Sequence, residues 1–154
     1  PTGRPLTMAL APVRPFRAWD FGDNVGIRVA FERAPHKDHP DWTESALRYL
    51  GVRHVRTNAT SPGSVTTIKR LHDRLGIRFH FTAIKPPTSA NESTTREFAR
   101  KRAAWIIANG LKGLTTSIES MNEWDDKGAP ALWMNQLRWA QDELWDVVRP
   151  QLRS

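Results

Sequence analysis

A tripeptide made of glycine, an aliphatic residue and arginine recurs in this sequence every 25 residues. The three copies are Gly26–Arg28, Gly51–Arg53 and Gly76–Arg78. Each copy opens a short run of β-branched and aromatic residues, which are typical of strands. A fourth such run follows a glycine in the same way. The four runs are 25–31, 51–59, 76–84 and 113–120. Strands at this spacing leave room for a helix after each one.

Apolar residues at helical spacing fill the segments between the runs. The sets that share a helix face are Trp42, Ala46, Tyr49 and Leu50; Val65, Ile68, Leu71 and Leu75; Phe98, Ala99, Ala103, Ile106 and Ile107; and Trp133, Leu137, Ala140, Leu144 and Val148. Two of the helices end on Leu-Gly, and glycine fits the left-handed position after a helix. Thr94 and Glu97 match a capping box, which predicts that the third helix begins near Thr94. Pro150 is expected to limit the fourth helix.

The order of these elements is strand, helix, four times over. Such alternation predicts an α/β fold in which helices cover a parallel sheet, either a barrel or a doubly wound sheet. No Gly-x-Gly-x-x-Gly sequence follows the first strand, which argues against a nucleotide-binding Rossmann domain. We expect residues 1–24, which are rich in proline, to form an irregular lead-in, and residues 25–154 to form one domain.

The composition narrows the classes of function. The chain has 154 residues and a net charge of +7, with its basic residues scattered, so we expect no nucleic-acid partner. The absence of cysteine excludes disulfides and thiolate metal sites. No apolar run is long enough to cross a bilayer, and no signal peptide is recognisable at the start.

Polar side chains follow each predicted strand, and in a parallel barrel the carboxyl ends of the strands build the active site. These ends are 30–36, 55–59, 82–87 and 118–125. Arg56 and Asn58 occupy alternate positions and should point to the same side. Glu119 and Glu123 alternate likewise if the fourth strand continues that far.

The sequence at this point resembles a family of enzymes. The stretch IESMNEWDD at 118–126, with the helix pattern at 131–148, is similar to the strand-four region of retaining (β/α)8 glycoside hydrolases of the β-xylosidase type, which carry an Asn-Glu pair there. The stretch WTESALRYLGVRHVRTN at 42–58 is similar to their first helix and second strand. The resemblance covers about 25–152 and implies half of a TIM-type barrel, a (β/α)4 unit.

The resemblance also implies roles for individual residues. Glu123 would act as general acid and then general base, and Asn122 would bind the sugar 2-hydroxyl. Arg56 would keep the nucleophilic carboxylate ionised, and Trp124 would stack on a sugar ring. Two further candidate sugar-binding residues come from position alone: Asn58, on the same side as Arg56, and His36, in the loop after the first strand. The partner would be a carbohydrate, with no cofactor and no metal, and a secreted or cell-surface location is favoured.

Two departures from the family pattern affect the site. Ser120-Met121 stands where relatives have Gly-Pro, and the first strand ends in Glu32 where relatives place a histidine. The resemblance also places the nucleophile on strand seven, whereas this chain has four predicted strands.

Several alternatives follow from the missing strands. The chain is the N-terminal half of a longer protein, pairs with a second copy, or is a carbohydrate-binding half-barrel without catalysis.

Alternatives also remain for single residues. Arg56 has an alternative role in an ion pair with Glu119 or Glu123. His36 and His39 form a sugar-binding or solvated loop, or a metal site that lacks an apparent third ligand.

Overall fold

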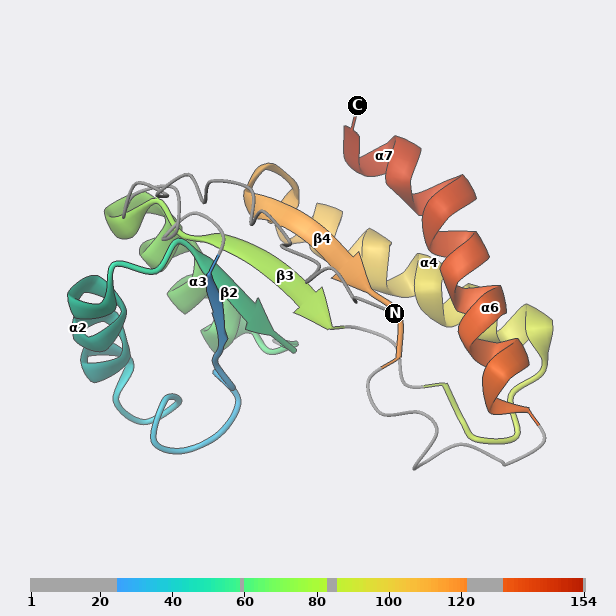
Figure 1. The fold of residues 1–154 in the computed structure, drawn as a ribbon, viewed down its shortest axis with the longest axis horizontal. Helices are drawn as coiled ribbons and strands as arrows, with labels where there is room; N and C mark the ends of the chain where they lie inside the picture. The colour runs from blue at the N-terminus through green and yellow to red at the C-terminus, as the bar shows by residue number, and fades with distance from the viewer. Residues whose placement is uncertain (1–24, 59, 83–85, 122–131, 154) are drawn as a thin grey trace, which may run out of the picture.

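The computed structural model describes residues 25–58, 60–82, 86–121 and 132–153, and Figure 1 shows their arrangement. Four strands alternate with helices, as the repeat predicts. The strands are β1 (Gly26–Arg28), β2 (His54–Thr57), β3 (Arg78–Thr82) and β4 (Thr115–Glu119). The helical elements are α2 (Pro40–Leu50), α3 (Pro62–Leu75), α4 (Glu92–Ala108), η1 (Lys112–Leu114), α6 (Trp133–Glu143), the π turn η2 (Leu144–Val148) and α7 (Arg149–Arg153).

The strands form one parallel sheet in chain order, β1-β2-β3-β4. This result confirms the predicted α/β class with a parallel sheet. A doubly wound sheet reverses its strand order at a switch point, and the four described strands show no reversal. The register between β3 and β4 shifts after Phe79, because His80 pairs with Ser117 and Thr116 is left over as a bulge.

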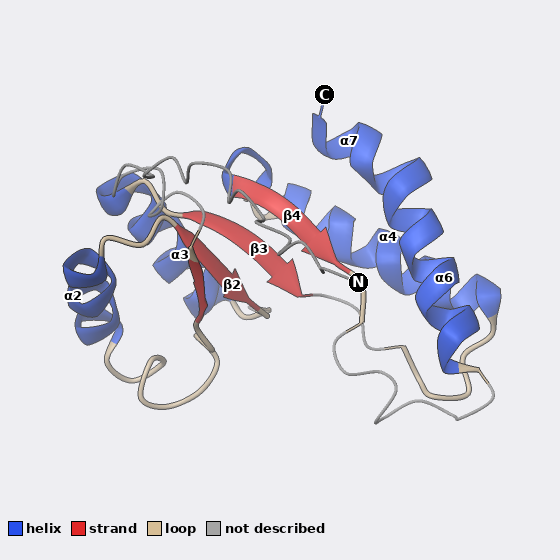
Figure 2. Cartoon of the chain, viewed as in Figure 1, coloured by secondary structure: helices blue, strands red, loops and turns tan. Residues whose placement is uncertain are grey.

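The unreversed order decides where the core lies. Crossovers between parallel strands are almost always right-handed, so crossovers that all step the same way place their helices on the same face. Figure 2 shows α3 and α4 behind the strands. Alternate strand residues on this face are buried against the helices. They include Val55, Phe79 and Phe81 from the strands and Ile68, Leu71 and Ile106 from the helices.

The last helical segment consists of α6, η2 and α7. It packs mainly on α4, and together they form a second, smaller core. Its buried members are Ala99, Ala103, Ala140, Leu144 and Val148. Small residues on both helices allow close approach. Beside them, the buried Glu143 carboxylate accepts a 2.6 Å hydrogen bond from Nε of Arg100. This ion pair fixes α6 along α4.

The predicted glycine positions at the helix ends are confirmed. Gly51 and Gly76 follow α2 and α3 in the left-handed region, with φ of 65° and 67°. Helix α4 begins at Glu92, close to the predicted start near Thr94, but the predicted capping box is wrong: the side chain of Asn91 caps the helix by accepting from the Thr94 backbone N–H at 2.9 Å. Asn91 lies in extended backbone before the first turn, which suits a cap.

The prediction that Pro150 limits the last helix is also wrong, because helix α7 runs from Arg149 to Arg153. A proline ring inside a regular α-helix clashes with the carbonyl four residues earlier and removes a hydrogen bond. Here the π turn Leu144–Val148 comes directly before, and its wider winding accommodates the ring.

Helix α2 packs with a different face from the one its apolar residues predict. The buried residues are Thr43, Glu44 and Leu47, while Trp42 and Tyr49 are exposed. The Glu44 carboxylate explains why this face is buried, because it forms ion pairs with Arg48, Arg70 and Arg74. Burial raises the pKa of Glu44, but hydrogen bonds from Arg74 and Arg48 outweigh this and lower it. In the part of the chain that the structure describes, we find no helix with the length and apolarity of a membrane span.

Candidate functional site

The face of the sheet opposite α3 and α4 is polar and forms an open groove of about 580 Å³. Its described lining residues are Gly26, Ile27, Arg28, His54, Arg56, His80 and Glu119. The polar residues His54, Arg56 and His80 alternate along the strands with the core residues Val55 and Phe79, as the two-residue period of a strand requires. A polar sheet face of this kind can bind a hydrogen-bonding ligand.

Arg56 and Glu119 form the central ion pair of this groove. Nε of Arg56 lies 2.8 Å from both carboxylate oxygens of Glu119, and Nη2 lies 2.6 Å from Oε2. Arg56 is on β2 and Glu119 on β4, so the pair reaches across β3. One of the two roles weighed for Arg56, an ion pair with Glu119, is therefore observed. The multiple contacts fix both side chains in one geometry.

Two histidines and a serine form a second network on the same face. Nδ1 of His80 lies 2.8 Å from the Ser117 hydroxyl, and Nε2 of His80 lies 3.4 Å from Nδ1 of His54. Burial lowers the pKa of His80, the neighbouring His54 lowers it further, and Glu119 raises it in part. The ring is therefore neutral near pH 7 and can both donate and accept a hydrogen bond. Both histidines act as bonded groups lining the groove.

Glu32 has a structural role that sequence reasoning missed. Its Oε1 accepts hydrogen bonds from the backbone N–H groups of Thr60 and Ser61, at 2.6 and 2.8 Å, and from the Ser64 hydroxyl at 2.8 Å. Burial raises the pKa of Glu32, but these hydrogen bonds together outweigh it and hold the pKa at about 2. The carboxylate thus joins the end of β1 to the start of α3.

Three of the predicted site residues lie outside the described residues. Asn122, Glu123 and Trp124 follow Met121, where the description of the fourth strand region ends. Their relation to Arg56 stays a prediction.

The other two predicted residues are described, and neither is among the described residues that line the groove. Asn58 is exposed just beyond β2. His36 lies in the loop after β1, where its Nδ1 is 3.1 Å from the Thr43 hydroxyl on α2. Next to it, His39 stacks on Trp42 with ring centroids 3.9 Å apart. Within the described ranges, no three His, Asp or Glu side chains gather closely enough to hold a metal ion.

Two buried side chains that the sequence analysis did not single out form hydrogen bonds to backbone carbonyls at the end of β3 and in the segment that follows it. The fully buried Gln136 donates from Nε2 to the carbonyls of Thr88 and Ala90, at 3.0 and 2.9 Å. Its position four residues before buried Ala140 was the available signal. The buried Arg102 donates to the Thr82 carbonyl at 3.4 Å and lies over the Trp105 ring. Burial lowers the pKa of Arg102 to about 10.

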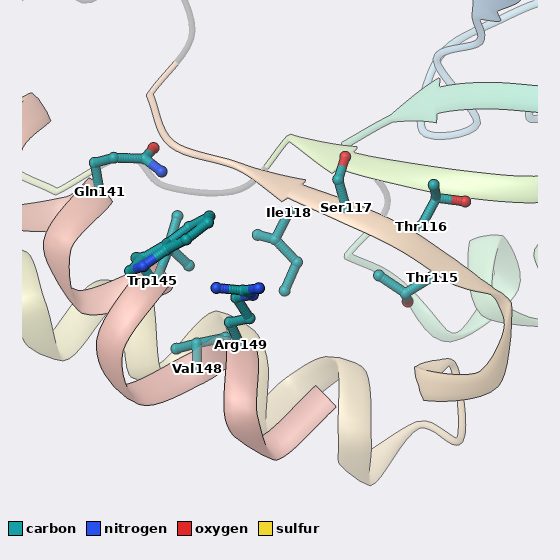
Figure 3. Close-up of a pocket in the computed structure, with 9 residues that line it drawn as sticks. Thr115, Thr116, Ser117, Ile118, Gln141, Trp145, Val148 and Arg149 are labelled. Atoms are coloured by element: carbon teal, nitrogen blue, oxygen red, sulfur yellow. The ribbon is translucent and has the colours of Figure 1, made fainter. Parts of the chain in front are cut away.

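A separate hollow of about 320 Å³ lies beside β4, on the side away from β3 (Figure 3). Thr115, Thr116, Ser117 and Ile118 line one wall, and Gln141, Leu144, Trp145, Val148 and Arg149 line the other. The Arg149 guanidinium lies 4.0 Å from the centre of the Trp145 ring. The hollow separates the edge strand from the last helical segment.

Comparisons with known proteins returned no relatives. No family model, no curated protein and no solved structure matches this chain. The interpretation of the site therefore depends on its own geometry and on the sequence resemblance.

Proposed function

We propose that this chain is one half of a retaining glycoside hydrolase barrel, corresponding to the N-terminal half in the family it resembles, and supplies its general acid/base, Glu123. The groove on the polar face would hold the sugar next to the scissile bond. Asn122 would bind its 2-hydroxyl and Trp124 would stack on its ring, while Asn58 and His36, which do not line the groove, would contact other sugar units of the substrate. The second carboxylate of the reaction would come from the other half of the barrel.

The Arg56–Glu119 ion pair is the observation that carries this proposal. It joins the ends of β2 and β4 on the open face of the sheet, and Glu119 precedes Glu123 by four residues. The positive charge of an arginine favours the anionic form of a further carboxylate brought beside it. Retaining hydrolysis needs this, because one carboxylate attacks the sugar while another group donates a proton. The unreversed parallel sheet, with helices over one face, is compatible with half of a barrel.

Glu119 itself does not complete the catalytic pair. The two carboxyl groups of a retaining enzyme lie roughly 5–5.5 Å apart on either side of the glycosidic bond. Glu119 and Glu123 are four residues apart on one chain segment, and Glu119 already binds Arg56. We assign Glu119 the role of positioning Arg56.

The test is hydrolysis of a panel of aryl β-glycosides by the full natural protein, with product anomers followed by proton NMR. We expect cleavage with retention and a loss of at least about 100-fold in kcat for Glu123→Gln, in line with general acid catalysis. The matched control Glu97→Gln, on the exposed surface of α4, should keep full activity. Full activity of Glu123→Gln would refute the proposal.

A second candidate, a carbohydrate-binding module without catalysis, is favoured by one observation. Among the described residues that line the groove, Glu119 is the single carboxylate, and it is engaged by Arg56. Under this candidate the protein binds oligosaccharides without turnover. Isothermal titration and the hydrolysis assay with the same sugars separate the two candidate functions. A binding module would bind the sugars without hydrolysing them, and Glu123→Gln would leave its affinity unchanged.

A further inference from the structure

Large apolar side chains are exposed at the two ends of the molecule. On α2 they are Trp42, Tyr49 and Leu50, and on the last helical segment they are Met134, Trp145 and Val147. Tyr49 is 91% exposed, Trp42 67% and Trp145 57%. Among the described residues, the one other exposed side chain of this class is Ile107 on α4. Clusters of exposed apolar side chains bordered by polar residues mark interaction surfaces.

These two helices flank the two edges of the sheet. Figure 1 shows α2 at one end of the row of strands and α6 with α7 at the other. Within the described ranges, β1 pairs with β2 alone and β4 pairs with β3 alone. An edge strand presents a row of backbone N–H and C=O groups that can pair with another strand. Among the described residues, each end therefore offers a strand edge with no neighbouring strand, beside an apolar helix face.

The hollow beside β4 gives the edge at that end room for a partner. It lies between Thr115–Ile118 and the helical residues Leu144, Trp145 and Val148. An incoming strand that pairs with β4 would cover the apolar part of this wall, beside Gln141 and Arg149. Strand β1 is short, but the residues at its polar face, Gly26 and Arg28, are exposed.

The charges on the two end helices are complementary. Asp41, which also pairs with Arg70, lies in the first turn of α2, and the exposed Arg48, which also pairs with Glu44, lies in its last turn. On the other end, exposed Arg138 lies in α6 and exposed Asp146 lies one turn before α7. The two helices each follow a parallel strand and run in the same direction, so a side-by-side packing brings Asp41 toward Arg138 and Arg48 toward Asp146.

Resting on the proposed half-barrel, we propose that a second copy of this chain supplies the other half: two copies join end to end, so that β4 of each copy pairs in parallel with β1 of the other. The face of α2 with Trp42 and Tyr49 packs against the face with Met134 and Trp145 of the second copy. A twofold axis relates the copies, and the two identical junctions close the eight strands into a ring. The ring encloses the polar groove and brings a second set of Arg56 and Glu119 to it.

The first test is the mass of the chain by light scattering over a range of concentrations. We expect a dimer, and a monomer at every concentration would overturn the proposal. Tyr49→Glu and Trp145→Glu should each raise the dimer dissociation constant at least about tenfold, because exposed aromatic anchors dominate interfaces. Ile107→Glu, on an exposed position of α4, is the matched control and should leave it unchanged. Circular dichroism checks that all three variants fold.

Mixing the two variants tests which faces meet. In an end-to-end dimer of Tyr49→Glu with Trp145→Glu, one junction carries both changes and the other carries neither. The mixture should therefore form more dimer than either variant alone. If α2 packed on α2 of the second copy, mixing would give no such recovery, and the end-to-end arrangement would be overturned.

Cross-linking tests the strand pairing. The chain has no cysteine, so Arg28→Cys on β1 and Thr116→Cys on β4 each introduce one thiol. A short bis-maleimide should link a mixture of the two variants and leave each variant alone unlinked. Absence of a link in the mixture, with a dimer present, would refute the pairing. Glycan binding and hydrolysis are separate readouts, so failure of the dimer is distinguishable from failure of the proposed function.

Discussion

Oε1 of Glu32 accepts a hydrogen bond from the Ser64 hydroxyl at 2.8 Å and connects the residues after β1 to the first turn of α3. The same oxygen accepts from the backbone N–H groups that precede the helix. A carboxylate at this point satisfies unpaired donors and complements the positive end of the helix dipole. Glu32 therefore stabilises the first strand-helix-strand unit, although its position at a strand end resembles that of a catalytic acid.

The stabilisation by Glu32 should depend on pH. Its pKa falls from 4.5 to about 2 on folding, so the contribution is fully present above about 4.5 and is lost as pH falls through about 2. We expect Glu32→Gln to lower the free energy of unfolding by about 1 kcal/mol at pH 7, as for loss of a helix cap. Urea unfolding from pH 7 to pH 2 should show the two proteins converging in acid. Glu97→Gln, on the exposed side of α4, should give a much smaller difference at every pH.

Gln136 should be essential for anchoring the segment after β3. Its Nε2 donates to two carbonyls of that segment, and it is fully buried. Gln136→Leu keeps the volume but leaves those carbonyls without their donor, so we expect a loss of about 1–3 kcal/mol. Thermal unfolding measures this loss, and hydrogen exchange should show faster exchange of the Ala90 amide, which bonds to the Pro87 carbonyl. Gln141→Leu, exposed on the same helix, is the control and should stay within about 0.5 kcal/mol of the parent.

A substitution of Gly76 tests whether the repeat needs a left-handed backbone at the glycine that follows a helix. It has a φ of 67° after α3, and a Cβ there would meet no atom within 4 Å, so the strain of a substitution is purely conformational. Gly76→Ala should lower the free energy of unfolding by about 1 kcal/mol. Gly113→Ala also has open space, but its φ lies outside the strained range, and we expect little change. Equal effects of the two substitutions in chemical unfolding would contradict this explanation.

The strands and their parallel class followed from the sequence because local signals marked them. Glycines with left-handed backbone end two helices, and the strand runs have a clear two-residue alternation. The packing face of α2 did not follow, because tertiary ion pairs to Glu44 outweighed its apolar pattern. Likewise, the cap of α4 depends on Asn91, which competed with a capping-box pattern three residues later.

The candidate site was predictable only where strand alternation determines side-chain direction. The alternation placed Arg56 and Glu119 on the polar face, but the sequence alone left open whether Arg56 binds Glu119 or Glu123. The contacts of His80 with Ser117 and His54 depend on the register of three strands, which includes a bulge after Phe79. No spacing along the chain encodes that register.

The Arg56–Glu119 pair should contribute more to ligand binding than to stability. Both side chains are partly exposed, so solvent screens their attraction, and we expect a coupling free energy of about 1 kcal/mol or less in a double-mutant cycle. Arg56→Met, Glu119→Gln and the double variant supply the cycle, measured by urea unfolding. Oligosaccharide titration of the same variants should show a larger loss for Arg56→Met than the unfolding data do. A loss of stability with unchanged glycan affinity would mean that the pair only holds the sheet together.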